Sequence, residues 1–315
     1  MPTTLITTPT FGRFSDEPWR VLREAGEAVL ACESGVLPAD ELRDRVAGAD
    51  ALVVGLDAIT AEVLDAAPRL KVVAKHGVGV DNIDLAAARE RGVRVTFAPG
   101  SNSRAVAELA FGLLLDAARR ITRTHTEVLA GAWPKHFGPE LAGRTLAVIG
   151  FGRIGRLVAG FAQAFGMTVV AYDPFLPEAE FAERGVRPLD LAACLAGADF
   201  VSLHMPGGSG PPLLDRAALS AMKPGACLVN TARGDLVDEH ALAELLHSGH
   251  VGAAALDAFD PEPLRADSPL RSAPNTVLTS HIGACSHEAN RDMGLTVARD
   301  VVRVLRGEEP LHPVG

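Results

Sequence analysis

The sequence predicts an α/β protein with two doubly wound parallel sheets, and three observations support this fold class. Short runs of β-branched and apolar residues alternate with amphipathic helical stretches along the chain. This alternation is typical of right-handed βαβ units, whose parallel sheets are covered by helices on both faces. The length of 315 residues suits two domains of about 100–200 residues each. A long helical pattern separates the strands into two series.

The first series of strands precedes residue 99. Its strands are short apolar runs, and the segments between them repeat apolar residues at helical spacing. We predict strands over residues 4–8, 28–31, 51–54, 71–74 and 94–97, and helices over residues 18–25, 39–46, 61–66 and 85–91.

A single long helix is predicted over residues 103–126, between the two series. The turn signal Pro99–Gly100 precedes it, and Asn102 or Ser103 can supply the N-cap. The strands of the second series are predicted over residues 144–149, 168–171, 200–203, 226–230, 252–255 and 276–278.

The last predicted helix, residues 286–306, has no strand after it and can pack back on the first domain. We therefore expect residues 1–99 and 285–315 to form one domain. Residues 100–284 would form a second domain inserted into the first, with a hinge at the two crossings.

Composition and charge disfavour several classes of protein. The formal net charge of −9 disfavours binding to nucleic acid or to anionic lipid. Aromatic residues make up 5% of the chain, too few for platforms on which single-stranded bases stack. The first residues lack the pattern of a secretory signal, and no apolar window is long enough to cross a bilayer. The cysteines form no CxxC pair, so we expect reduced thiols, no metal site and a cytoplasmic protein.

A glycine-rich turn follows the first strand of the second series. The strand runs into Gly150-Phe-Gly152-Arg-Ile-Gly155, which opens a helical pattern. Gly150 allows the tight turn, Gly152 lets the backbone approach a pyrophosphate, and Gly155 brings helix and strand close. Asp173, at the end of the next strand, suits the adenosine ribose hydroxyls and would repel the 2′-phosphate of NADP. We predict a Rossmann domain that binds NAD.

Three titratable side chains lie just after predicted strands of the second series. Arg233 follows the strand that ends at Asn230, Glu262 lies in a proline-rich turn, and His281 follows the last strand. Taken alone, each residue has a purely structural explanation. Arg233 can form a surface ion pair, Glu262 can be a solvated turn residue, and His281 can be a histidine whose hydrogen bonds are made within the fold. Because open α/β sheets bind ligands at the carboxyl ends of their strands, their occurrence beside a dinucleotide motif favours a catalytic set.

Five motifs occur in a characteristic order: KHGVGVDNID at 75–84, GFGRIG at 150–155, NTARGDLVDEHAL at 230–242, DAFDPEP at 257–263 and SHIGA at 280–284. In this order they resemble the D-isomer-specific 2-hydroxyacid dehydrogenases, closest to the D-3-phosphoglycerate dehydrogenase-like branch. The resemblance covers nearly the whole chain. It implies a flavodoxin-like substrate domain built from both chain ends, with a Rossmann NAD domain inserted between them. It also implies a catalytic set of Arg233, Glu262 and His281.

The proposed chemistry needs these residue types. Oxidation of a secondary alcohol requires a base for the hydroxyl proton, and reduction requires the same group as an acid; His281 can serve both near neutral pH. A carboxylate on its other ring nitrogen, from Glu262, would fix the tautomer. The fork of Arg233 can clamp a substrate carboxylate and polarise the carbonyl.

The resemblance and the glycine motif together place NAD against residues from several segments of the second domain. Asp257 is equally well explained as a strand-end cap, and His204 would contribute its backbone only. The loop 207–212 departs from the family's usual Thr-bearing sequence, so local contacts there stay open. The expected cofactor set is Gly150, Gly152, Arg153, Ile154, Gly155, Asp173, His204, Pro206, Thr231, Ala232, Asp257, His281, Gly283 and Ala284.

The loop after the fourth strand of the first series is the expected substrate site. Its glycines let backbone N–H groups approach a carboxylate, and the set is Lys75, His76, Gly77, Val78 and Gly79, together with Arg233. Lys75, His76 and Arg13 can add charge for a second anionic group such as a phosphate, or they are solvated rim charges.

We therefore expect an NAD-dependent oxidoreductase that acts on C2 of a D-2-hydroxy acid, 3-phosphoglycerate-like. The alternatives are a hydroxypyruvate or glyoxylate reductase of the same family and a non-catalytic NAD-sensing corepressor. Since the chain ends at Gly315, no C-terminal regulatory domain is expected. Other side chains carry weaker signals: a nucleophilic pair of Cys285 with His281 lacks an oxyanion hole, and His247 and His250 fit helix-end surface positions better than metal ligands.

The resemblance also implies a homodimer, with the long helix and the arm near Trp133 at the interface. The apolar stretch 109–118 fits such an interface, and it fits a buried helix within one chain equally well.

Overall fold

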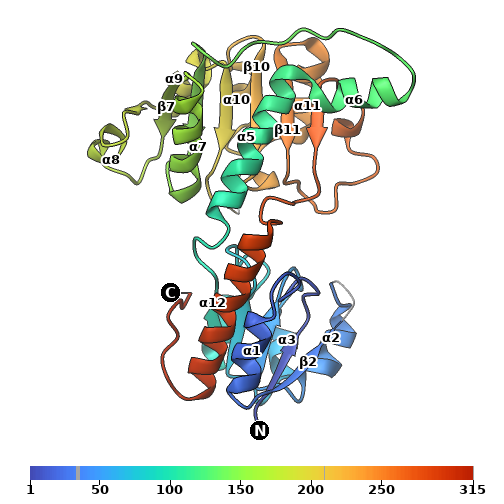
Figure 1. Ribbon diagram of the computed structural model, residues 1–315, viewed down its shortest axis with the longest axis vertical. Helices are drawn as coiled ribbons and strands as arrows, with labels where there is room; N and C mark the ends of the chain where they lie inside the picture. Colours follow the sequence, from blue (N-terminus) through green and yellow to red (C-terminus); the bar gives the residue numbers. More distant parts are fainter. Residues whose placement is uncertain (33–35, 209, 315) are drawn as a thin grey trace. The chain divides into compact units, whose positions relative to one another are not determined.

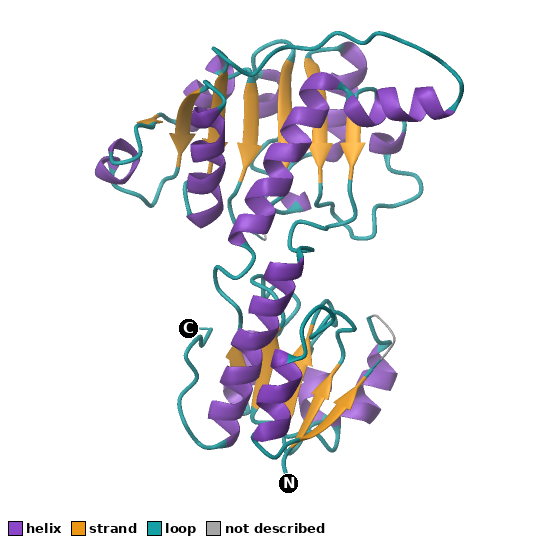
Figure 2. Ribbon diagram, in the orientation of Figure 1, coloured by secondary structure: helices purple, strands orange, loops and turns teal. Residues whose placement is uncertain are grey.

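The computed structural model describes residues 1–32, 36–208 and 210–314 (Figure 1). Internal contacts divide the chain into two compact units. Unit 1 comprises Met1–Asn102 and Ala284–Gly315, and unit 2 comprises Ser103–Gly283. In each unit the strands lie side by side with helices on both faces (Figure 2). The prediction of two parallel-sheet α/β domains is confirmed.

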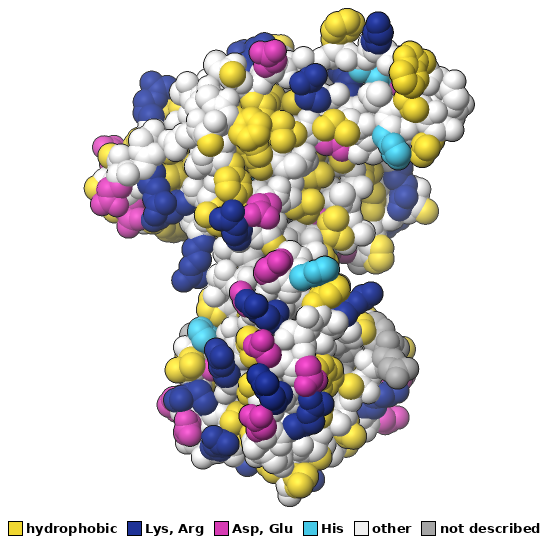
Figure 3. All heavy atoms as spheres, viewed as in Figure 1, with side chains coloured by type: hydrophobic (Ala, Val, Ile, Leu, Met, Phe, Trp, Pro, Cys, Tyr) yellow, Lys and Arg dark blue, Asp and Glu magenta, His cyan; other side chains and the backbone are white. Residues whose placement is uncertain are grey.

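Unit 1 contains a five-stranded parallel sheet in the order β2-β1-β3-β4-β5. The central strands β3 and β4 are buried along their whole length, which explains their continuous apolar runs. Helix α12 packs on β4 and on α1, and Figure 3 shows basic and acidic side chains interspersed over this face. The strands are β1 (Thr3–Ile6), β2 (Ala28–Ala31), β3 (Ala51–Val54), β4 (Val72–Lys75) and β5 (Arg94–Thr96), and the helices are α1 (Glu17–Glu24), α2 (Ala39–Val46), α3 (Ala61–Asp65), α4 (Leu85–Glu90) and α12 (His287–Leu305).

Unit 2 contains a seven-stranded parallel sheet in the order β12-β11-β10-β9-β6-β7-β8. The order reverses direction between β6 and β9, and open sheets of this kind bind ligands at such a switch point, beyond the carboxyl ends of the strands. The strands are β6 (Thr145–Ile149), β7 (Thr168–Tyr172), β8 (Arg187–Pro188), β9 (Phe200–Leu203), β10 (Ala226–Asn230), β11 (Val251–Leu256) and β12 (Thr276–Leu278).

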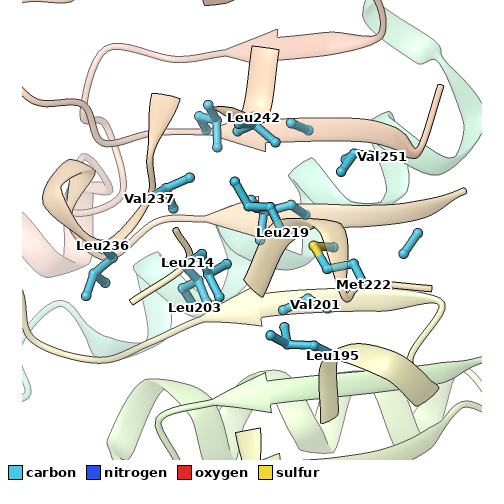
Figure 4. Close-up of a cluster of buried hydrophobic side chains, with 14 of the residues drawn as sticks. Leu195, Val201, Leu203, Leu214, Leu219, Met222, Leu236, Val237, Leu242 and Val251 are labelled. Carbon is cyan, nitrogen blue, oxygen red and sulfur yellow. The ribbon is translucent and has the colours of Figure 1, made fainter. Parts of the chain in front are cut away.

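Helices cover both faces of the unit 2 sheet and create two separate cores. Leu146 and Val148 of β6 face one core, with α5 and α7, whereas Ala147 and Ile149 face the other, with α9, α10 and α11. Figure 4 shows part of the second core. The helices are α5 (Ser103–Arg119), α6 (Ile121–Leu129), α7 (Arg153–Ala164), α8 (Glu178–Ala182), α9 (Leu191–Gly197), α10 (Arg216–Ser220) and α11 (Glu239–Ser248), with short 3-10 turns η1 (Gly234–Leu236) and η2 (Pro269–Arg271).

The prediction of one continuous helix over residues 103–126 is wrong. Arg120 adopts a left-handed conformation with φ of 56°, which ends α5 and starts α6 in a new direction. The carboxylate of Asp116 accepts hydrogen bonds from the backbone N–H and the hydroxyl of Thr122, which satisfies a donor at the start of α6. Among the described residues, no helix has both the length and the apolar character needed to cross a membrane.

Candidate active site

The glycine turn after β6 has the geometry that its sequence predicts. Gly150 has φ of 93°, and a Cβ added there would lie 2.6 Å from the carbonyl oxygen of His204. A Cβ on Gly155 would lie 2.1 Å from the carbonyl oxygen of Gly150, so this glycine lets α7 approach the strand. A Cβ on Gly152, the N-cap of α7, would meet nothing within 4 Å. Open space therefore remains beside the helix N-terminus, where a phosphate group fits.

Two further observations fit a dinucleotide at this turn. Asp173 follows β7, and its two carboxylate oxygens accept the N–H groups of Phe151 at 2.9 Å and Phe175 at 3.0 Å, which holds the carboxylate beside the glycine turn. Thr231, just beyond β10, has a buried hydroxyl that bonds to no group among the described residues. The open space at Gly152, this orphaned hydroxyl and the Asp173 carboxylate match the parts of a bound NAD.

His281 and Glu262 form a hydrogen-bonded pair beyond the carboxyl edge of the sheet. The Nδ1 atom of His281 lies 2.8 Å and 2.9 Å from the two carboxylate oxygens of Glu262. The backbone N–H of Phe259 also donates to Glu262, at 3.0 Å. This fixes the Glu262 side chain and makes Nδ1 of His281 the protonated ring nitrogen. The Nε2 atom, which has no hydrogen bond among the described residues, is left to exchange a proton.

The pair changes the pKa of both groups. The hydrogen bond to Glu262 raises the pKa of His281 above its ordinary value, against the opposing effect of burial. Burial alone would raise the pKa of Glu262, but the hydrogen bonds from His281 and from Phe259 outweigh it, so this pKa is lowered. The positive charge of Arg233 lowers the pKa of both groups, which places the guanidinium near the pair. The structure thus brings Arg233, Glu262 and His281 together.

Arg233 is held in place by the end of β10. Asn230, which is buried, donates its amide N–H to the carbonyl oxygen of Arg233 at 2.8 Å and accepts the N–H of Ala232 at 2.9 Å. The side chain of Asn230 therefore fixes the backbone between β10 and η1. The positioning role of Asn230 was not predicted, because an Asn at a strand end reads equally well as a turn residue.

Asp257 holds the loop that carries His281. One of its carboxylate oxygens accepts the N–H of Ile282 and the hydroxyl of Thr279, and the other accepts the N–H of Gly283, all within 2.8 Å. Asp257 is 1% exposed. Of the two explanations open from the sequence, these contacts favour the strand-end cap, and contact with the nicotinamide stays a prediction. His281 has φ of 55°, so this loop depends on its supports.

The imidazoles of His204 and His247 have hydrogen-bond partners within the fold. Burial lowers the pKa of His204 to about 3, and its Nε2 lies 2.9 Å from the hydroxyl of Ser202, so this imidazole is neutral. His247 bonds through Nδ1 to the carbonyl of Ala243 within α11. Cys285 is exposed. Among the described residues, no three His, Cys, Asp or Glu side chains gather as a metal site requires.

In unit 1 two side chains at the start of the loop after β4 differ from their expectation, because Lys75 and His76 are both buried. The ammonium group of Lys75 does not point to solvent, because it donates to the carbonyl of Gly55 at 2.5 Å and to the amide oxygen of Asn82 at 2.6 Å. Burial lowers the pKa of His76 to about 4, so the imidazole is neutral at pH 7. The N–H groups of Val78 and Gly79 donate to no acceptor among the described residues, as expected of a loop that binds a carboxylate.

Comparison with known proteins identifies the family. The sequence model of the D-isomer specific 2-hydroxyacid dehydrogenase NAD-binding domain matches residues 111–283, more than half of the chain. The chain belongs to this family. Its unit 2 contains the family's NAD-binding domain, which confirms the predicted cofactor class.

Individual members of the family are similar over most of the chain. A D-3-phosphoglycerate dehydrogenase from Methanocaldococcus jannaschii is 41% identical over 96% of this chain and 57% of its own length. A hydroxypyruvate reductase from Thermotoga maritima is 42% identical over 88% of this chain and 91% of its own length. The crystal structure of the TT0316 protein from Thermus thermophilus superposes with a TM-score of 0.90 at 42% identity, covering 99% of this chain and all of the other. The chain thus spans about half the length of the phosphoglycerate dehydrogenases that it matches.

Proposed function

We propose that the protein is an NAD-dependent oxidoreductase that interconverts a D-2-hydroxy acid and the corresponding 2-oxo acid. The observation that carries this proposal is the His281–Glu262 pair beside Arg233. It combines a proton donor of raised pKa, a fixed orientation and a cation for a carboxylate. These are the groups that reversible hydride transfer at C2 requires.

Each member of the set has one role in reduction. Arg233 binds the substrate carboxylate through its fork and polarises the C2 carbonyl. The Nε2 atom of His281 donates a proton to the C2 oxygen as that oxygen gains negative charge. Glu262 stabilises the imidazolium before the transfer and keeps Nδ1 protonated after it. In oxidation the same Nε2 removes the hydroxyl proton.

When bound, NADH would supply the hydride for the reduction of C2, and NAD would accept it in oxidation. Within unit 2, Gly150, Gly152 and Gly155 with the N-terminus of α7 would hold the pyrophosphate, and Asp173 would bind the adenosine ribose. Thr231 and Ala232 would line the cofactor beyond β10. The loop 77–79 of unit 1 would bind the substrate carboxylate through its backbone N–H groups.

The relatives support two substrates. One is a D-3-phosphoglycerate dehydrogenase and another a hydroxypyruvate reductase, at nearly equal identity. The 3-phosphoglycerate-like substrate predicted from the sequence and the hydroxypyruvate or glyoxylate alternative are therefore both supported by similarity.

A steady-state screen of NADH oxidation with a panel of 2-oxo acids tests the function. We expect turnover of at least one acid. His281→Ala should lower kcat about 10²–10⁴-fold, the contribution of positioned acid–base catalysis. The matched control is His247→Ala, which removes a histidine of α11 and should leave kcat unchanged. Tight NADH binding without turnover of any acid would favour the corepressor.

A further inference from the structure

The loops at the carboxyl ends of β1, β3 and β4 form one hydrogen-bonded cluster in unit 1. Lys75 and Asn82, at the start and end of the β4 loop, both donate to the carbonyl of Gly55 in the β3 loop. Asn82 also donates to the carbonyl of Asp57, whose carboxylate accepts the hydroxyl of Thr7 after β1 at 2.6 Å. The expected carboxylate-binding N–H groups at Val78 and Gly79 therefore lie on a loop whose two ends are fixed.

This network includes the ammonium group of Lys75, which was expected from sequence to bind a second anionic group of the substrate. Lys75 is 7% exposed and its ammonium group already has two oxygen partners. Moving it toward a phosphate would break both bonds and release the β3 loop. Lys75 is therefore a positioning residue of the loop cluster.

The imidazole of the neighbouring residue, His76, is neutral and therefore cannot replace Lys75 as a cation for a phosphate. His76 is 7% exposed, lies against the ring of Phe11 and faces Gly294 of α12, and its Nε2 has no hydrogen bond among the described residues. The positive charge of Lys75 further opposes protonation, and the hydrogen bond to the backbone of Asn290, which favours protonation, is outweighed by burial. Burial without a carboxylate partner keeps the ring neutral.

The described loops at the carboxyl edge of the unit 1 sheet carry a net negative charge, which disfavours the binding of a phosphate. The described residues that follow the five strands, 7–16, 32, 36–38, 55–60, 76–84 and 97–102, include one basic residue besides His76, Arg13. Against it stand four carboxylates: Asp16, Asp57, Asp81 and Asp84. A dianion beside this edge would meet net repulsion.

Apolar side chains project from the same loops. Leu56 follows Gly55 directly and is 66% exposed, and Val78 lies between the two loop glycines and is 37% exposed. Such side chains contribute contact area to a substrate group that needs no charge partner. Arg13 is exposed, with its guanidinium 5.7 Å from the ring of Phe14.

From this arrangement we infer that the substrate is a 2-oxo monocarboxylate whose side chain is uncharged and packs against Leu56 and Val78. The inference rests on the proposed function and restricts its substrate class. It favours an unphosphorylated acid over the 3-phosphoglycerate-like substrate predicted from the sequence.

The test compares kcat/KM for NADH-dependent reduction of hydroxypyruvate, pyruvate and 2-oxobutyrate with that for phosphohydroxypyruvate. We expect kcat/KM for at least one of these three acids to exceed kcat/KM for phosphohydroxypyruvate by tenfold or more. Leu56→Arg, which adds a cation beside the loop cluster, should raise kcat/KM for phosphohydroxypyruvate relative to hydroxypyruvate by about tenfold. Leu311→Arg is the matched control, because Leu311 is 58% exposed on the C-terminal segment of unit 1.

Two results would overturn the inference, and a third would overturn the proposed function. A wild-type preference for phosphohydroxypyruvate would do so, most directly if Arg13→Ala abolished it. An equal change of the ratio in Leu56→Arg and Leu311→Arg would remove Leu56 from the substrate site. Turnover of no acid at all, with NADH still bound, would instead overturn the proposed function.

Discussion

At the scale of single residues, the His281–Glu262 pair sets the pH range in which reduction is possible. Proton donation to the C2 oxygen needs the imidazolium form of His281. Because the hydrogen bond to Glu262 raises the pKa of His281, this form persists to higher pH than it would in an unpaired histidine. Reduction by the wild type should therefore decline above the ordinary histidine pKa, and oxidation should rise over the same range.

Glu262→Gln removes the negative charge and keeps the shape of the side chain. We expect the decline of kcat/KM for reduction to move to lower pH, with a loss of about tenfold or more at pH 8, a part of the total acid–base contribution. The measurement is a pH profile of kcat/KM for reduction. Glu244→Gln, in an exposed ion pair with Arg216, is the control. A profile of Glu262→Gln that overlays the wild type would contradict the role of the pair.

Asp173 is the residue that should select NADH over NADPH. Its carboxylate is fixed by two backbone N–H groups, so it cannot turn away from a 2′-phosphate without losing them. We expect Asp173→Ala and Asp173→Asn each to raise the ratio of kcat/KM for NADPH to that for NADH by tenfold or more. Asn keeps an acceptor for the backbone while losing the charge. A change in the Ala variant alone would attribute the effect to a loosened turn, and a wild-type preference for NADPH would contradict the assignment.

At the scale of elements, the two glycines at the start of α7, Gly152 and Gly155, have different physical roles. Gly155 is required by packing, because an added Cβ would lie 2.1 Å from a backbone oxygen that cannot move aside. Gly152 faces open space, so a side chain there costs the apo protein little and occupies the expected pyrophosphate position.

Two substitutions separate these roles. Gly155→Ala should destabilise unit 2 by about 1–3 kcal/mol, the usual cost of overpacking, and lower the Tm by several degrees. Gly152→Ser, which keeps a favourable N-cap, should leave the Tm unchanged and raise the Kd for NADH at least tenfold. Thermal unfolding and NADH titration of both variants provide the check. Equal effects on Tm would contradict the assignment of Gly152 to the ligand.

The elements that could be predicted from sequence are those with a strong local signal. Strands β3 and β9 are buried on both faces, so their apolar runs mark them within a residue. The break at Arg120 could not be predicted, because it depends on Asp116 bonding to Thr122 and no Gly or Pro marks it. The strand β8 spans Arg187–Pro188, too short for any periodic pattern.

In the candidate site, too, the features with a local sequence signal could be predicted and those that depend on contacts between distant residues could not. The glycine turn was predictable because its backbone geometry excludes other residues. The engagement of Lys75 was not, since its acceptors come from Gly55, a residue of another loop, and from Asn82. From sequence alone, a charged residue at a strand end predicts a ligand site in two different cases. Its charge is either available to a ligand or already paired within the fold, and the sequence does not distinguish them.

At the scale of the whole molecule, an acidic protein is proposed to bind anionic ligands. The net charge of −9 repels them at long range, but salt screens this repulsion beyond about 8–10 Å. Short-range groups decide binding: the N-terminus of α7, the N–H groups of Val78 and Gly79, and Arg233. Each is directional, so each can favour a carboxylate or a phosphate at one position while the surface remains repulsive.

The surface around α6 is the expected interface between two copies of the chain. No residue of α6 is buried, and an irregular arm follows the helix over residues 130–141. Large apolar side chains are exposed there: Ile121, Leu129, Trp133 and Phe137. Monomeric proteins rarely leave a large contiguous apolar patch in water, so we predict a homodimer that covers these side chains.

Replacement of Trp133 and Phe137 by Glu tests the homodimer. Trp133 is 83% and Phe137 is 88% exposed, so neither supports the fold of its own unit and the double variant should keep its Tm for unit 2. Two desolvated carboxylates per chain in an apolar interface are costly, and the variant should therefore run as a monomer in light scattering where the wild type runs as a dimer. Leu311→Glu, at an apolar position of unit 1 that is 58% exposed, should leave the mass unchanged. A wild-type mass of one chain would contradict the dimer, and a double variant that stays dimeric would place the interface elsewhere.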